Sequence, residues 1–155
     1  MPAAGDEWAV VERGGEALRF RPAGVEGAGA AAALADLRGG RWQLEGELAV
    51  LEAEILDDRL SSTTYPDPLA RVWSALTAPH SGDFVVSLAP GYEAVDWGGA
   101  THAGGGSHGA LHAGDSLGPL LFVGCGPESA DARDQWTLRD VAPAVLEHFG
   151  VERDE

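Results

Sequence analysis

The side chains best suited to chemistry lie in one polar segment between Gly98 and Ser116. It contains three histidines and an aspartate in the pattern His-x5-His-x3-His-x2-Asp, namely His102, His108, His112 and Asp115. Neutral imidazole nitrogens and carboxylate oxygens suit zinc and similar divalent ions, and glycines let a backbone bend sharply enough to aim several ligands at one point. The pattern is no standard zinc spacing, and polar glycine loops often contain solvated histidines. Metal binding and simple solvation are therefore the two interpretations of this segment.

The same segment also fits the nucleophile elbow of a serine esterase, G-x-S-x-G, with Ser107 as the nucleophile. Asp115 or Asp140, and then His148, follow in the chain order of that triad. An elbow requires a buried strand directly before the serine and a helix directly after it. Here glycines precede Ser107 and a polar loop follows, so the esterase is a weaker hypothesis than metal binding.

Five short elements follow one another between about Tyr65 and Val151. They are Gly106-Ser107-His108-Gly109, Asp115-Ser116, Pro119-Leu120-Leu121, Gly124-Cys125-Gly126-Pro127 and Thr137-Leu138-Arg139-Asp140-Val141-Ala142-Pro143. Their joint order resembles the closing segment of the alkaline phosphatase superfamily, and most of all its nucleotide pyrophosphatase and phosphodiesterase branch. The resemblance implies an α/β fold, part of a three-layer sheet covered by helices. Residues 61–155 would be the C-terminal part of that core, and residues 1–60 a small insertion-like region containing a β-hairpin.

The resemblance also implies a function, the metal-dependent hydrolysis of phosphodiesters, nucleotide pyrophosphates or phosphomonoesters. It identifies His108 as a zinc ligand, whereas His102 and His112 match no ligand position and are weaker candidates for the metal. Asp115 resembles a polar residue near the substrate entrance, and Ser107 is expected to shape the turn. In such two-metal centres one ion activates a Ser or Thr oxygen, and the other stabilises the leaving oxygen.

Most of that centre is missing from this chain. Such a centre needs about half a dozen ligands and a nucleophile, and the family draws nearly all of them from sequence before the late histidine. Neither the early Asp with its Ser or Thr nor the Ser-Asp-His-Gly element is found. We therefore expect the isolated chain to be weak or inactive, and to require upstream sequence, a complementing chain or self-association. The alternative is a non-catalytic acidic α/β module for binding or interaction.

The charge and composition limit the partners. The formal net charge is -15, with ten arginines and no lysine, which argues against a nucleic-acid polymer. A small phosphate ester stays compatible, because a bound metal ion can reverse the field in a cleft. Cys125 is the single cysteine, so no intrachain disulfide is possible. No apolar run approaches the roughly 20 residues of a membrane span, and no signal peptide is visible. A cytoplasmic protein without a membrane partner is expected.

The pattern of the first sixty residues predicts short secondary-structure elements separated by glycines. The runs 8–12 and 17–21 flank Gly14-Gly15, a pair that favours a tight hairpin turn. The Gly- and Ala-rich stretch 24–33 predicts a loop leading into a short helix that ends near residues 38–40. The pattern of residues 42–55 fits a strand or a helix equally.

The second half predicts an order of helix, strand, loop, strand and helix. Asp67-Pro68 begins a helix that stops before Pro79, and a last helix runs from Thr137 to Gly150 with its apolar side facing the core. Residues 84–89 and 119–123 are expected to be buried strands on either side of the histidine loop. This order favours an α/β sheet with the loop leaving a strand end.

Overall fold

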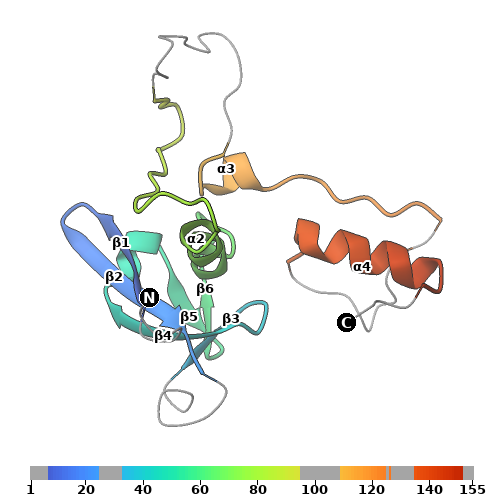
Figure 1. Cartoon of the computed structure of the whole chain (residues 1–155), viewed down its shortest axis with the longest axis horizontal. Helices are drawn as coiled ribbons and strands as arrows, with labels where there is room; N and C mark the ends of the chain where they lie inside the picture. The colour runs from blue at the N-terminus through green and yellow to red at the C-terminus, as the bar shows by residue number, and fades with distance from the viewer. Residues whose placement is uncertain (1–6, 25–32, 95–108, 125, 127–134, 152–155) are drawn as a thin grey trace. The chain divides into compact units, whose positions relative to one another are not determined.

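A computed structural model of the chain describes residues 7–24, 33–94, 109–124, 126 and 135–151. The chain divides into two compact units, residues 1–117 and residues 118–155. The architecture is mixed α/β, with an open mixed sheet of six strands and three α-helices in the described part (Figure 1). None of these helices is long and apolar enough to cross a membrane.

The whole sheet lies in the first unit. Its strands are β1 (Ala9–Arg13), β2 (Glu16–Pro22), β3 (Leu34–Asp36), β4 (Arg41–Gly46), β5 (Glu54–Leu56) and β6 (Arg59–Ser61). They are ordered β1-β2-β4-β3-β6-β5. Neighbouring strands are antiparallel except for β3 and β6, which are parallel. A short 3-10 helix, η1 (Leu48–Leu51), connects β4 to β5.

Strands β1 and β2 pair through a two-residue turn at Gly14 and Gly15, whose φ angles are 63° and 88°. Positive φ at both central positions is the geometry that matches the twist of a hairpin, and glycine adopts it without steric cost. These strands are no separate region, because β2 also pairs with β4 and contributes Leu18 and Phe20 to the core of the sheet. The domain boundary between residues 60 and 61 stays a prediction.

The core lies on one face of the sheet. Along β2 the side chains alternate, so that Leu18 and Phe20 are buried while Arg19 is exposed. Helix α2 (Pro68–Leu76) packs on the buried face, where its Leu69 is 1% exposed, and Figure 1 shows it beside the strands. The rings of Trp73 in α2 and Trp42 in β4 meet edge to face at 6.4 Å. The helix therefore closes a small aromatic core.

A buried carboxylate organises the turn between β3 and β4. Asp36 accepts hydrogen bonds from the backbone amides of Arg38 and Gly40, at 2.9 and 2.8 Å, and from the indole Nε1 of Trp42 at 2.7 Å. A Cβ at Gly40 would lie 2.4 Å from the Asp36 carboxylate oxygen. The short helix predicted to end near residues 38–40 is wrong, because this side chain binds the amides of a turn that reverses the chain.

The prediction of a helix after Asp67 is confirmed. Pro68 occupies its first turn, where the missing N–H costs nothing. The ambiguous stretch 42–55 contains both kinds of structure, because β4 is followed by η1 and then by β5. Strands β5 and β6 join through Asp57 and Asp58, whose φ angles of 48° and 59° are left-handed. These three-residue strands are too short to show an alternating pattern.

The two predicted buried strands are wrong. Residues 84–89 and 119–123 have no regular secondary structure, and the exposed fractions of Phe84 and Leu121 are 91% and 81%. An apolar run predicts burial only if neighbouring strands pair with it and other elements cover it. In the described part of the chain no strand of the sheet pairs with either segment.

The second unit contains helix α4 (Leu138–His148). The predicted last helix is confirmed, and a capping box begins it, because Thr137 and Asp140 satisfy each other's backbone amides. Gly150 follows the helix with φ 64°. The predicted orientation is wrong, because Leu138 and Phe149 are 90% and 72% exposed. The cap residues predict where a helix begins, whereas burial depends on what it packs against.

Candidate functional site

The structure describes only part of the predicted site. His102, Ser107 and His108 lie outside the described residues. His112 and Asp115 are described, and both belong to the turn around α3 (Ala113–Ser116) in the first unit. The assignment of His108 to a metal therefore stays a prediction, and the geometry of the site starts from this turn.

His112 caps the first turn of α3 with its ring. Its Nδ1 accepts a hydrogen bond from the backbone amide of Gly114 at 3.0 Å. A neutral imidazole that accepts at Nδ1 carries its proton on Nε2, so the Nε2 lone pair is then not available to a metal. His112 can bind a metal through Nε2 only if this hydrogen bond is given up. In the described geometry its role is to shape the turn.

A charged network lies beside His112. Its ring meets Tyr65 edge to face at 6.1 Å. The Glu52 carboxylate accepts hydrogen bonds from the Thr64 hydroxyl, at 2.7 Å, and from the Arg13 guanidinium. These two bonds, the Thr64 bond first, lower the pKa of Glu52, and the Glu52 bond raises the pKa of Arg13. Glu52 therefore stays ionised to lower pH than an ordinary glutamate.

Arg71 in helix α2 binds the turn around α3. Its Nη1 donates to the carbonyl oxygens of Pro66 and Leu111, at 3.0 and 2.9 Å. Its Nη2 donates to the carbonyl oxygen of Ala110 at 3.4 Å and to the Ser116 hydroxyl at 2.7 Å. Burial lowers the pKa of Arg71, and the nearby charge of Asp67 raises it. Arg71 has no signal in the sequence, because most of its partners are about 40 positions away along the chain.

Two further hydrogen bonds hold the turn. The amide of Ala113 donates to the carbonyl of Thr64 at 2.8 Å. The amide of Leu111 donates to the Ser87 hydroxyl at 2.8 Å, which joins the two chain segments on either side of the histidine loop. The Leu111 side chain packs against the core. The chain is thus anchored at Leu111, three residues after His108.

The donor set needed for zinc is not assembled by the described residues. Within them, no three His, Cys, Asp or Glu side chains come together as a group that could hold a metal ion. Asp115 is exposed at the start of α3, where a carboxylate is favoured by the orientation of the backbone amides. His112 and Asp115 alone do not fit the four-ligand sites typical of zinc.

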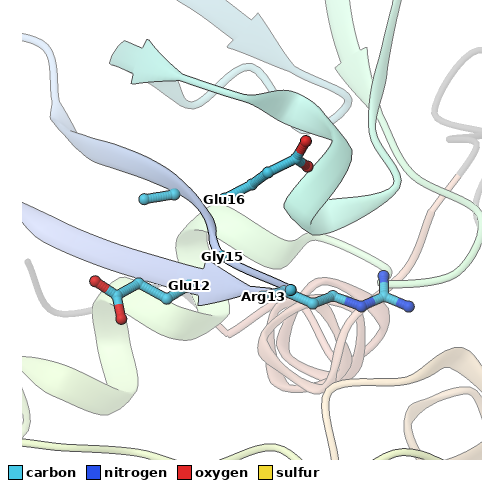
Figure 2. A pocket seen from close by; sticks show the side chains of 6 residues that line it. Glu12, Arg13, Gly15 and Glu16 are labelled. Carbon is cyan, nitrogen blue, oxygen red and sulfur yellow. The ribbon is translucent and has the colours of Figure 1, made fainter.

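One surface hollow of about 370 Å³ lies at the turn between β1 and β2. It is lined by Glu12, Arg13, Gly14, Gly15, Glu16 and Ala17. Figure 2 shows the side chains of Glu12, Arg13 and Glu16 pointing away from one another rather than toward a common point. Because a ligand site needs convergent polar groups, this hollow is not a candidate active site.

Two described residues of the alternative serine triad, Asp140 and His148, interact with neighbours at the ends of α4. The Asp140 carboxylate accepts hydrogen bonds from the amide and hydroxyl of Thr137, at 2.7 and 3.1 Å, as the cap of α4. His148 is exposed and packs edge to face on Phe149, with their ring centres 4.9 Å apart. The described geometry therefore offers no support for Asp140 as the residue that orients a catalytic histidine.

Compared with known proteins, the chain matches no family model, no curated protein and no solved structure.

Proposed function

We propose that the chain is the C-terminal portion of a metal-dependent phosphoric ester hydrolase, active only when further sequence or another chain completes its site. The proposal starts from the ordered motifs around His108, which resemble the nucleotide pyrophosphatase and phosphodiesterase branch of the alkaline phosphatase superfamily. Its substrate would be a small phosphodiester, nucleotide pyrophosphate or phosphomonoester. A cytoplasmic location belongs to the same proposal.

The observation that carries the proposal is the exposure of the two apolar segments flanking the histidine loop. Residues 84–86 and 120–123 have sequences suited to a fully covered sheet, yet Phe84, Val86, Leu121 and Val123 are each more than three-quarters exposed. Leaving such side chains in water costs about 1.5–3 kcal/mol each relative to burial. In the proposal, both segments are inner strands of a larger sheet of the alkaline phosphatase type, which the completing sequence supplies.

The proposal assigns the metal chemistry to residues that converge only in the completed protein. His108 would be one zinc ligand, and the remaining ligands and the nucleophile would come from the completing sequence. When bound, the metal ions would offset the charge that builds up on the phosphoryl oxygens. This chain's own described contribution is the turn of residues 110–116, held by Arg71 and by the amide of Ala113.

The test is a zinc titration by calorimetry, followed by an assay with a nitrophenyl phosphodiester. The isolated chain should bind zinc weakly and through His108, because it lacks most of the ligands, and it should show no turnover. The H108A variant should lose the binding. The matched control is H80A, which removes an exposed histidine that lies outside the loop. Addition of the sequence encoded upstream should restore turnover in the wild type and not in H108A.

Two results would contradict the proposal. Zinc binding that is unchanged in H108A would remove the residue on which the assignment depends. Zinc-dependent turnover by the isolated chain, at a rate typical of an enzyme, would show that its site is complete and that the account of missing ligands is wrong.

The second candidate function is a non-catalytic acidic interaction module. The exposed apolar segments give this function its support, because an interaction partner would cover them. The two functions differ in their metal dependence. An interaction module would bind its partner equally well in H108A and in the presence of a chelator.

A further inference from the structure

We propose that Arg71 is a positioning residue, whose guanidinium sets the geometry of the turn at residues 110–116 and thereby the placement of His112 and Asp115. The inference rests on the proposed function, in which this turn lies directly after the metal ligand His108. It adds to that function a residue of helix α2 that the motifs of the histidine loop do not include.

Arg71 binds atoms at both ends of the turn. Its four hydrogen bonds go to three backbone carbonyls and one hydroxyl, and three of these acceptors, in Ala110, Leu111 and Ser116, belong to the turn. The acceptors lie at both ends of the turn, so one planar group fixes their separation. The Ser116 hydroxyl is also within 3.2 Å of the Ala110 and Leu111 carbonyls, which closes the turn around the guanidinium.

Placing the Arg71 charge here has an electrostatic cost. Arg71 is partly buried, and its hydrogen bonds go to neutral oxygens rather than to a carboxylate. A partly desolvated cation requires good hydrogen bonds to be tolerated. A neutral side chain could pack at this position without that cost, so what the arginine adds is the fixed direction of its donors.

The geometry of these hydrogen bonds is specific to arginine. Arginine presents five N–H donors in a rigid plane, whereas lysine presents three donors on one flexible ammonium group. Only the planar fork can hold the Leu111 carbonyl on one nitrogen and the Ser116 hydroxyl on the other. Charge alone would attract the carbonyls without fixing their positions.

The anchored turn is adjacent in sequence to the predicted ligand, because Gly109 alone separates His108 from Ala110, whose carbonyl Arg71 binds. Functional sites need their groups held to within about 0.5 Å. In the proposed function, a shift of the turn by about an ångström would therefore weaken metal binding.

The experiment compares the full chain with its R71A and R71K variants. Hydrogen exchange is followed at the amides of Ala113 and Leu117, which donate to Thr64 and Ala113 within the anchored region. Zinc affinity is measured on the same samples. The matched control is R21A, which removes an arginine of the first unit whose Nε donates to Gln43 on the sheet. Exchange at sheet amides reports whether each variant is folded.

In R71A we expect amide hydrogen exchange at the turn to become about tenfold faster, which corresponds to the loss of one hydrogen bond to a charged group. Amide exchange in the sheet should stay unchanged. His108-dependent zinc affinity should fall about tenfold. R71K should recover little of either effect, and millimolar guanidinium should restore both in R71A. R21A should change neither quantity at the turn.

Unchanged exchange at the turn in folded R71A or R71K would overturn the inference, as would full recovery by lysine. His108-dependent zinc binding that is insensitive to Arg71 would also overturn it, while leaving the proposed function intact. If the wild type shows no His108-dependent zinc binding but the turn still depends on Arg71, the proposed function fails and the positioning role stands.

Discussion

Asp36 determines the path of the backbone between β3 and β4 because one buried carboxylate serves three donors. Two of these donors are amides of the turn, and the third is the indole of Trp42, which belongs to the aromatic core. Gly40 leaves just enough room for the carboxylate, since a Cβ there would lie 2.4 Å from its oxygen.

G40A should therefore reduce the free energy of unfolding by about 1–3 kcal/mol, because the methyl group forces apart a packed and hydrogen-bonded pair. Urea denaturation followed by tryptophan fluorescence measures the change. G82A serves as control, because a Cβ at Gly82 would meet only the Phe84 carbonyl at 3.7 Å and should change stability by less than about 0.5 kcal/mol. Equal stability of the two variants would show that Asp36 can move without cost.

At the same scale, only part of the candidate site could be predicted from sequence. A histidine in a glycine-rich polar segment is a candidate ligand by its type, so the sequence points to His112. Its use of Nδ1 as a cap depends on a local fold that composition does not reveal. Arg71 carries no such signal, because an arginine on an amphipathic helix ordinarily faces solvent. Its role depends on backbone carbonyls that tertiary structure brings to it.

At the scale of elements, the residues that begin helices were reliable signals, whereas apolar runs were not. Pro68 and the Thr137–Asp140 box predicted the beginnings of two helices, because capping involves only neighbouring residues. The segments 84–89 and 119–123 were predicted as strands from their apolar runs, yet pairing needs a partner that the described sheet does not provide. These two strand predictions thus failed for one physical reason, namely that strand formation is a property of a pair.

Helices α2 and α4 offer a matched comparison, because each contains a leucine near its start in a different environment. Leu69 is 1% exposed and Leu138 is 90% exposed. L69A should reduce the free energy of unfolding by about 2–5 kcal/mol through lost burial and a cavity. L138A should change it by less than about 0.5 kcal/mol.

Denaturant unfolding of both variants measures the difference between the two helices. A large loss of stability in L138A would mean that the apolar side of α4 is covered in solution, for example by another copy of the chain. Dilution of the sample would then decrease the stability of the wild type, because association stabilises by mass action.

At the scale of the whole molecule, two properties of the surface oppose each other. The net charge of -15 disfavours self-association, whereas exposed apolar side chains favour it. Salt changes the balance, because at about 0.15 M ionic strength exposed charges are screened beyond about 8 Å.

We therefore expect the chain to self-associate as salt is raised, and the double variant F84S/V86S to do so less. Sedimentation velocity at low and moderate salt measures the association, and binding of a hydrophobic dye measures the exposed surface. V10S is the control, since Val10 is about half exposed but lies on an ordered strand of the sheet. Association that is equal in F84S/V86S and V10S would mean that residues 84–86 do not drive it.

The parallel pairing of β3 with β6 has a consequence for how the chain folds. Two-residue turns join β1 to β2 and β5 to β6. Such hairpins can form within microseconds. The β3–β6 ladder must instead wait until β4, η1 and β5 have brought two distant stretches together. The entropy of closing that longer loop is lost before its contacts can stabilise the chain. The refolding rate should therefore depend on the β3–β6 pairing. Weakening the turns between β1 and β2 or between β5 and β6 should mostly increase the unfolding rate.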